Sequence, residues 1–273
     1  MGKVLYAKPV REEILTEVKE KMRNLNFKPV LGIIRVGENS WDLSYEKGLK
    51  KTAEEIGAEV VVKEFSKDAS EDEIIEGIKE YNDKAEVRGI LVFRPLPKTL
   101  GEDKIAEAID YKKDVDSMCK RNLAEVFLGN ESGHYPITPQ GAVKILEHYG
   151  YEFKGKKALV INRSPVVGRP LVNLLLNRNA TVTIAHTKTV DIKKEIQNSD
   201  YVFLATGQGE KFTADYFKGH EVVCDIGINV NKEGKLCGDL NPDAFLNVAA
   251  YTPVPGGVGA ITNLLLFNEM LKY

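Results

Sequence analysis

The sequence has few cysteines and no long hydrophobic run. The three cysteines are odd in number, lie far apart and include no CxxC pair, so neither a disulfide framework nor a zinc site is expected. The four histidines form no ligand pair at helical spacing, and no metal site is predicted. No apolar run reaches the roughly 18 residues of a membrane span, and the start MGKVLYAKPVREEI lacks a secretory signal. These absences predict a cytoplasmic protein without a membrane partner.

An excess of either charge is also missing. The chain of 273 residues has 38 basic and 40 acidic side chains, a formal net charge of -2. This balance gives no electrostatic footprint for nucleic acid. Neither nucleic acid nor an anionic membrane is therefore the expected partner; a small-molecule substrate is what the resemblance described below implies.

What is present is a regular alternation of apolar strands and amphipathic helices, which is typical of parallel sheets covered on both faces. The length suits two α/β domains, and the second is expected to be Rossmann-like. We expect the first domain to span residues 1–136 and to be completed by a C-terminal helix at 258–273, and the second to span 137–257. The boundary is placed in the Gly/Pro-containing loop near residues 135–138. The expected strands of the two series are 29–37, 58–65, 89–97, 157–162, 181–186, 201–206 and 221–227. The expected helices are 9–25, 40–57, 70–84, 138–150, 166–179, 191–199 and 259–273.

The strand KALVIN is followed by RSPVVGRP and a helix, where a dinucleotide fold places its phosphate turn. The usual G-x-G-x-x-G would put glycines at positions occupied by Asn162, Ser164 and Val167, and only Gly168 is close. Spacing alone leaves a nucleotide site and an ordinary strand–helix turn about equally supported. The strand TVTIAH ends in His186, Thr187 and Lys188, without the carboxylate that binds a ribose 2′-hydroxyl. With Arg163 and Lys188 as cations this favours NADP, with NAD as the alternative, although a single lysine is more often a solvated surface residue.

Several motifs resemble those of the methylenetetrahydrofolate dehydrogenase/cyclohydrolase family. They are GILVFRPLP (89–97), KDVD (113–116), RSPVVGRP (163–170), CDIGIN (224–229), TPVPGGVGAITNLLLFN (252–268) and the helix that contains Tyr45. Their order and spacing match the family over nearly the whole chain, and TPVPGGVG is the most specific of them. The resemblance implies two α/β domains with a cleft between them, a homodimer, and oxidation of 5,10-methylenetetrahydrofolate by hydride transfer to NAD(P). Most members then hydrolyse the methenyl product to 10-formyltetrahydrofolate.

The resemblance also implies roles for particular residues. Asp116 would bind the pterin ring and Tyr45 would stack on the folate; without the family, Asp116 could be a turn or cap residue and Tyr45 a half-buried core aromatic. Thr252 and the turn after it would line the site near the nicotinamide and the pterin. The residues expected to bind folate are Tyr45, Asp116, Pro253, Val254, Pro255, Gly256, Gly257 and Val258. The residues expected to bind the cofactor are Asn162, Arg163, Ser164, Val167, Gly168, His186, Thr187, Lys188, Thr206, Gly207, Gly227, Ile228 and Thr252.

The sequence departs from the family at two catalytic positions. The family has a lysine four residues after the helix tyrosine and a glutamine after the strand valine, and this chain has Leu49 and Phe93 there. Hydride transfer needs positioning and no side chain that moves a proton. Hydrolysis loses typically about 10²–10⁴-fold without its general acid/base. We therefore expect a dehydrogenase with weak or absent cyclohydrolase activity.

Two alternatives stay open at this point. In the first, the enzyme is fully bifunctional and Lys50, Lys47 or Arg94 replaces the missing groups. In the second, the chain binds folate or a nucleotide without turnover.

Overall fold

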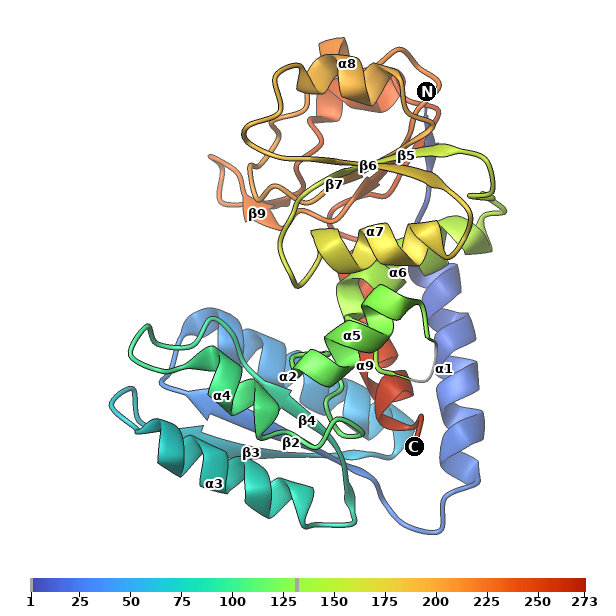
Figure 1. The fold of residues 1–273 in the computed structure, drawn as a ribbon. Helices are drawn as coiled ribbons and strands as arrows, with labels where there is room; N and C mark the ends of the chain where they lie inside the picture. The colour runs from blue at the N-terminus through green and yellow to red at the C-terminus, as the bar shows by residue number, and fades with distance from the viewer. Residues whose placement is uncertain (1, 131–132) are drawn as a thin grey trace. The chain divides into compact units, whose positions relative to one another are not determined.

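The computed structural model describes residues 2–130 and 133–273 (Figure 1), and these residues form two compact units. Unit 1 comprises Met1–Glu12 and Pro136–Thr262, and unit 2 comprises Glu13–Tyr135 and Asn263–Tyr273. Each unit is therefore built from two stretches that are far apart in the sequence. The sequence predicts that residues 1–136 belong to one domain. In the structure, residues 2–12 are instead part of unit 1, together with Pro136–Thr262.

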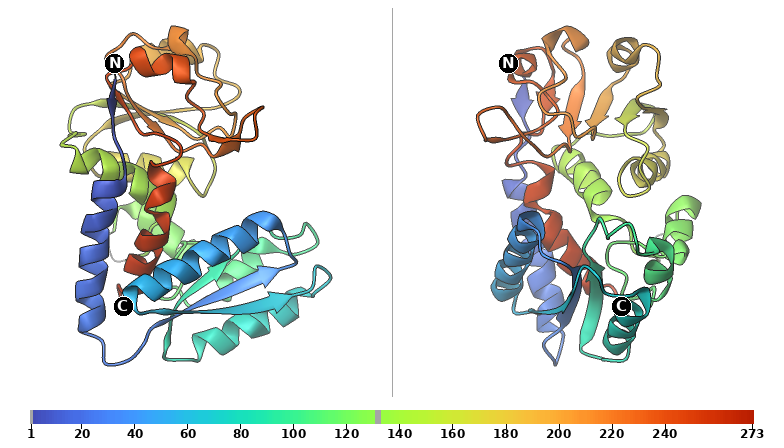
Figure 2. Two further views of the ribbon diagram at one scale, coloured as in Figure 1. Left: turned by 180° about the vertical axis from the view of Figure 1, so that it is seen from behind. Right: turned by 90° about the vertical axis from the view of Figure 1, so that its left-hand side faces the viewer.

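Unit 2 is built on a three-stranded parallel sheet in the order β3-β2-β4. Its strands are β2 (Val30–Val36), β3 (Glu59–Phe65) and β4 (Val87–Val92). Its helices are α2 (Ser40–Ile56), α3 (Glu71–Asn82), α4 (Glu102–Glu107) and α5 (Lys120–Leu128), together with most of α1 (Lys8–Arg23) and α9 (Thr262–Met270). Because strand residues alternate between faces, Val30 and Ile34 pack with α3 and α4 in one cluster. Figures 1 and 2 show α3 and α4 on one face of the sheet and α2 on the other.

The helix ends in unit 2 follow the sequence signals. Ser70 caps α3 with a full capping box, since its Oγ accepts from the Glu73 N–H and Glu73 accepts from the Ser70 N–H. Asn39 caps α2 through Asp42 N–H at 2.8 Å. Gly57 ends α2 at φ 82°, a left-handed conformation that glycine adopts without a steric penalty. These caps fix the register of α2, on which Tyr45 and Leu49 lie.

Unit 1 contains a six-stranded sheet in the order β1-β11-β8-β7-β5-β6, and every neighbouring pair is parallel. The strands are β1 (Lys3–Val4), β5 (Lys157–Ile161), β6 (Thr181–Ala185), β7 (Tyr201–Leu204), β8 (Val222–Asp225) and β11 (Ala250–Tyr251), and a separate hairpin joins β9 (Asn229–Val230) to β10 (Leu236–Cys237). The helices are α6 (Ile137–His148), α7 (Gly168–Leu176) and α8 (Ile192–Gln197), with short 3₁₀ turns η1 (Ala214–Tyr216), η2 (Pro242–Leu246) and η3 (Val258–Ala260).

The strand order of unit 1 reverses at β5, because β6 lies on one side of β5 and β7 on the other. In open α/β sheets such a switch point leaves a crevice at the carboxyl ends of the strands, where ligands bind. Figure 1 shows α6 and α7 on one face of this sheet and α8 on the other. The core between the sheet and the α8 side is almost entirely aliphatic and aromatic.

The strands and long helices predicted from the sequence are present, with ends shifted by a few residues. Three features are absent from the sequence expectation: the helices α4 and α5, the hairpin β9–β10, and the pairing of β1 with β11. The final helix also begins later than expected, at Thr262, after the 3₁₀ turn at Val258–Ala260. No helix in the described part of the chain is long and apolar enough to cross a membrane.

Candidate active site

The helix α2 presents Tyr45 and Leu49 one turn apart on the same side. Tyr45 is 38% exposed, whereas Leu49 is completely buried. Phe93 follows β4, is 5% exposed, and has its ring centroid 5.5 Å from that of Tyr45. The two positions at which the family motif has a lysine and a glutamine are therefore filled by buried apolar side chains, and neither can transfer a proton.

Lys50, a candidate substitute for the missing lysine, is already paired with another residue. Its Nζ donates to Glu46 Oε1 at 2.6 Å. Glu46 is buried and also accepts from Arg35 Nε at 3.2 Å. Successive helix residues are turned by about 100°, so Lys50 lies on the Glu46 side of α2 and away from Leu49. Lys47 is exposed on the same helix.

Arg94 and Asp116 form an ion pair close to Tyr45. The Arg94 guanidinium donates to Asp116 Oδ2, and its other terminal nitrogen lies 3.6 Å from Glu102 Oε1 on α4. Burial raises the pKa of Asp116, while the charge of Arg94 and its hydrogen bond act in the opposite direction. Burial, with a further contribution from the charge of Asp116, raises the pKa of Tyr45. Tyr45 is thus a neutral phenol at physiological pH and cannot serve as a base.

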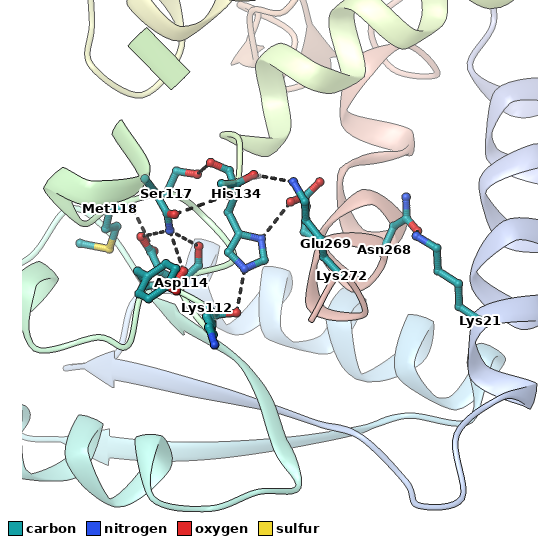
Figure 3. A network of polar contacts seen from close by, with 12 residues as sticks. Lys21, Lys112, Asp114, Ser117, Met118, His134, Asn268, Glu269 and Lys272 are labelled. Atoms are coloured by element: carbon teal, nitrogen blue, oxygen red, sulfur yellow. Dashed lines mark hydrogen bonds and ion pairs between the residues drawn. The ribbon is translucent and has the colours of Figure 1, made fainter. Parts of the chain in front are cut away.

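The loop that presents Asp116 is held by a neighbouring carboxylate. Asp114 is 1% exposed, and it accepts from the N–H groups of Met118 and Cys119, each at 2.9 Å, and from Asn122 Nδ2 at 3.0 Å (Figure 3). Ser117 has φ 53° and donates its hydroxyl to the His134 carbonyl at 2.6 Å. Of the two aspartates in KDVD, Asp114 therefore shapes the loop and leaves Asp116 available for another role.

His134 anchors the same loop to the C-terminal helix. Its ring is fully buried, Nε2 lies 2.8 Å from the Lys112 carbonyl, and Nδ1 lies 2.9 Å from Glu269 Oε2 (Figure 3). A carbonyl can only accept, so Nε2 is the donor to Lys112, and Nδ1 lies within hydrogen-bond distance of the Glu269 carboxyl group. Lys272 adds a bond to the carbonyl of Gly133. This network stabilises the Asp116 loop within unit 2.

In unit 1, the turn between β5 and α7 is closed by its own side chains. Asn162 Oδ1 accepts from the N–H groups of Ser164 (2.8 Å) and Gly168 (3.0 Å), and Ser164 Oγ accepts from the Val167 N–H at 3.1 Å. These bonds leave fewer free N–H groups for an anion than the sequence pattern predicts. The exposed side chain of Arg163 is the cation of this turn. Gly168 is required here, since a Cβ would lie 2.0 Å from the Asn162 carbonyl oxygen.

The residues after β6 form a second small turn. The His186 N–H donates to Thr189 Oγ1 at 3.0 Å, and the Lys188 N–H donates to His186 Nδ1 at 3.1 Å. Thr187 and Lys188 are exposed. This turn presents a hydroxyl and an ammonium group and no carboxylate, which suits a 2′-phosphate.

The loops after β7 and β8 are joined by two buried aspartates. Asp239 accepts from the N–H and hydroxyl of Thr206 and from the Gln208 N–H. Asp225 accepts from the N–H groups of Gly227 (2.9 Å), Asp239 (3.1 Å) and Leu240 (2.8 Å). Burial raises the pKa of Asp225 to about 6. Of the expected cofactor residues on these loops, Gly207 is exposed at φ 66° and Ile228 is 59% exposed.

The turn at 252–259 borders a cavity of about 250 Å³ in unit 1. Its lining residues include Asp225, Gly227, Ile228 and the whole segment 253–259. Gly256 has φ 105°, and a Cβ on Gly257 would lie 2.5 Å from the Pro253 carbonyl oxygen, so both positions need glycine. Thr252 is 1% exposed, and its hydroxyl accepts from the Asp225 N–H at 2.8 Å. Thr252 thus supports the end of β8, and the residues after it form the wall of the cavity.

These features fit a dinucleotide. The sheet has its switch point at β5, the strand ends carry glycine turns where a side chain would clash or be strained, and exposed cations follow β5 and β6. The described residues contain no group of three or more His, Cys, Asp or Glu placed to bind a metal ion. Fold and site together define a dinucleotide-binding α/β protein with a second α/β unit that carries an aromatic and carboxylate site.

Comparison with known proteins gives the family. Residues 5–116 match the catalytic domain of tetrahydrofolate dehydrogenase/cyclohydrolase, and residues 136–273 match the NAD(P)-binding domain of the same family. The chain belongs to this family of folate oxidoreductases.

Relatives match over nearly the whole chain. The bifunctional protein FolD of Clostridioides difficile is 42% identical over 99% of this chain and 96% of its own length. The crystal structure of the bifunctional FolD from Campylobacter jejuni has a TM-score of 0.96 at 34% identity and covers 100% of this chain and 98% of its own. The enzyme from Trypanosoma brucei, solved with NADP cofactor and an inhibitor, has a TM-score of 0.92 at 26% identity over 99% of this chain and 96% of its own.

Sequence reasoning missed four residues that build the site. Asp114 and Asp239 are buried carboxylates that each bind several donors, and the partners lie up to 33 positions away in the sequence. Arg94 was considered only as a substitute cation, and its pairing with Asp116 depends on the fold. Asp225 lies in the motif CDIGIN and is fully buried, so the motif was the one signal that could have indicated it.

Proposed function

We propose that this chain oxidises 5,10-methylenetetrahydrofolate to 5,10-methenyltetrahydrofolate. The observation that supports this most strongly is the match of both halves of the chain to the two domains of one folate enzyme family. Tyr45 and Asp116 provide an aromatic ring and a carboxylate in one part of unit 2, as stacking on folate and hydrogen bonding to a pterin ring require. We assign folate binding to residues 1–136 with 258–273, and cofactor binding to residues 137–257.

In this proposal the side chains position the reactants and move no proton during the oxidation. The bound nicotinamide supplies the hydride acceptor. The turn at 253–258 and Ile228, which line the cavity in unit 1, lie near the nicotinamide in this proposal. Tyr45, which packs on the buried Phe93, presents its ring to the folate, and Asp116 accepts from pterin N–H groups. Positioning of this kind supplies much of the acceleration of a reaction between two held partners.

We propose NADP as the cofactor. Lys188 and Thr187 follow β6 where an NAD site has a carboxylate, and Arg163 adds a second cation after β5. The T. brucei relative, whose structure contains NADP, supports this choice. The ratio of kcat/KM for NADP to kcat/KM for NAD tests it, and a ratio below one would contradict the assignment of Lys188.

Hydrolysis of the methenyl product is the second candidate activity. The relatives are named bifunctional, so the comparisons favour the fully bifunctional alternative over a dehydrogenase with weak cyclohydrolase activity. Leu49 and Phe93 favour weak cyclohydrolase activity, because both are buried and neither can transfer a proton. A general acid/base typically increases the rate by about 10²–10⁴-fold, so the rate of hydrolysis distinguishes a bifunctional enzyme from a dehydrogenase with weak cyclohydrolase activity.

One assay tests all these activities. Purified protein is given 5,10-methylenetetrahydrofolate with NADP, and methenyltetrahydrofolate is followed by its near-ultraviolet absorbance. Accumulation of the methenyl product indicates a dehydrogenase, and its decay above the spontaneous rate indicates a bifunctional enzyme. Without any change in absorbance, the chain would be a binding protein and the proposed function would be wrong. We further propose a homodimer in the cytoplasm, which light scattering and cell fractionation test.

A further inference from the structure

We propose that Arg94 is a positioning residue that holds the carboxyl group of Asp116 in place for the pterin ring of folate. The proposal rests on the proposed function, because that function assigns Asp116 to the pterin. It adds a role for the residue directly after Phe93, which is one of the two positions where this chain departs from the family motif.

The geometry shows Arg94 held from two sides. One terminal nitrogen donates to Asp116 Oδ2, and the other lies 3.6 Å from Glu102 Oε1 on α4. The side chains of Arg94 and Asp116 are only 19% and 23% exposed. A guanidinium restrained in this way can hold one carboxylate oxygen and leave the other, Oδ1, to accept from a ligand.

The charged and titratable groups around Asp116 come from three parts of unit 2. Arg94 follows β4, Asp114 lies on the loop of Asp116 itself, and Tyr45 belongs to α2. Glu102 on α4 reaches the site through Arg94. Asp114 and burial both favour the protonated form of Asp116, and among these groups only Arg94 favours the carboxylate.

Loss of Arg94 therefore has a defined consequence. The pKa of Asp116 is raised by burial and by Asp114, and Arg94 lowers it. Without the guanidinium, Asp116 becomes protonated at a higher pH. A protonated carboxyl group presents one acceptor fewer to the pterin N–H groups, so folate affinity falls as the pH decreases.

The test measures binding directly and does not depend on turnover. Trp41 is the only tryptophan of the chain and lies one helical turn before Tyr45 on α2. Quenching of its fluorescence by 5-formyltetrahydrofolate gives Kd between pH 5 and 8, with free N-acetyltryptophanamide as the inner-filter control. We expect the midpoint of the affinity loss to move up by about 1–3 pH units in Arg94→Met. Arg94→Lys, which keeps the charge, should restore most of the wild-type profile.

Further variants separate this role from a structural one. Arg94→Gln serves if Arg94→Met does not fold, and an unchanged urea-unfolding midpoint shows that the protein is intact. In Arg94→Met combined with Asp116→Asn the pH dependence should disappear. An intact Arg94→Met or Arg94→Gln variant with the wild-type midpoint would overturn the role of Arg94 alone. A wild-type protein that binds no 5-formyltetrahydrofolate at any pH would overturn both this inference and the proposed function.

Discussion

Replacing the two apolar side chains beside Tyr45 should increase hydrolysis of methenyltetrahydrofolate. The change is Leu49→Lys combined with Phe93→Gln, which introduces the residue types that the family motif has at these positions. Leu49 lies one turn from the partly exposed Tyr45, so the four-carbon stem of a lysine can pack along α2 while its ammonium reaches the folate side. If a general acid/base is what the site lacks, the rate should rise by about 10²–10⁴-fold.

The loss of stability in this variant follows from the burial of Leu49. Leu49 is 0% exposed, and truncating such a leucine costs about 2–5 kcal/mol. A lysine keeps most of the aliphatic volume, so we expect the variant to lose about 1–3 kcal/mol in free energy of unfolding. Leu49→Met is the matched control, because it preserves volume and apolar character. Urea unfolding of both variants checks this cost before any rate is compared.

The assay follows the decay of added methenyltetrahydrofolate in wild type, both single variants, the double variant and Leu49→Met. Because the amide would orient the amine, the two substitutions should act together, and the double variant should exceed the product of the single effects. A folded double variant that keeps dehydrogenase activity and hydrolyses no faster than Leu49→Met would refute the reasoning. Rapid hydrolysis by wild type would refute it as well, and would agree with the names of the relatives.

Three further predictions concern unit 1. Gly168→Ala places a Cβ 2.0 Å from the Asn162 carbonyl oxygen, so it should lower the free energy of unfolding by about 1–3 kcal/mol. In the control Gly259→Ala, the Cβ would lie 3.7 Å from Ile228 Cδ1, an ordinary contact, and the free energy of unfolding should change little in the same urea titration. Asp225 has a pKa raised to about 6, so the folded state binds the extra proton and stability falls as the pH rises from about 4 to 6, by about 1–3 kcal/mol. Asp225→Asn should remove this slope from urea unfolding measured at several pH values, and an unchanged slope would contradict the assignment. Lys188→Ala should lower kcat/KM for NADP by about tenfold, which corresponds to the 1–2 kcal/mol of one charge-assisted contact. The kcat/KM for NAD should stay nearly unchanged. Equal losses for both cofactors would show that Lys188 does not bind the 2′-phosphate.

Much of the fold could be predicted because its strands are long enough to show a period. β2 contains five apolar positions, and β3 and β5 contain four each. By contrast, β1 and β11 contain two residues each, and no periodicity exists over two positions. Their pairing is decided by tertiary contacts, which sequence patterns do not report.

The candidate site could likewise be predicted only in part. The position of Tyr45 and the loss of a lysine at Leu49 could be predicted, because helical spacing is local. The ion pair between Arg94 and Asp116 could not, because 22 positions separate the two residues and a loop of unusual conformation brings them together. Asp239 is similar, since it bonds Thr206 across 33 positions.

The division of each unit into two stretches has a consequence for biosynthesis. Unit 1 needs residues 2–12 at one end and Tyr251 at the other, since β1 pairs with β11. Unit 2 in turn needs Asn263–Tyr273. Unit 1 can therefore become complete only after Thr262 has been synthesised, and unit 2 only after Asn263–Tyr273 has been synthesised. Until then β1 lacks its partner strand β11. A nascent chain stalled before residue 250 should for this reason be far more sensitive to protease, and a better chaperone client, than the released protein.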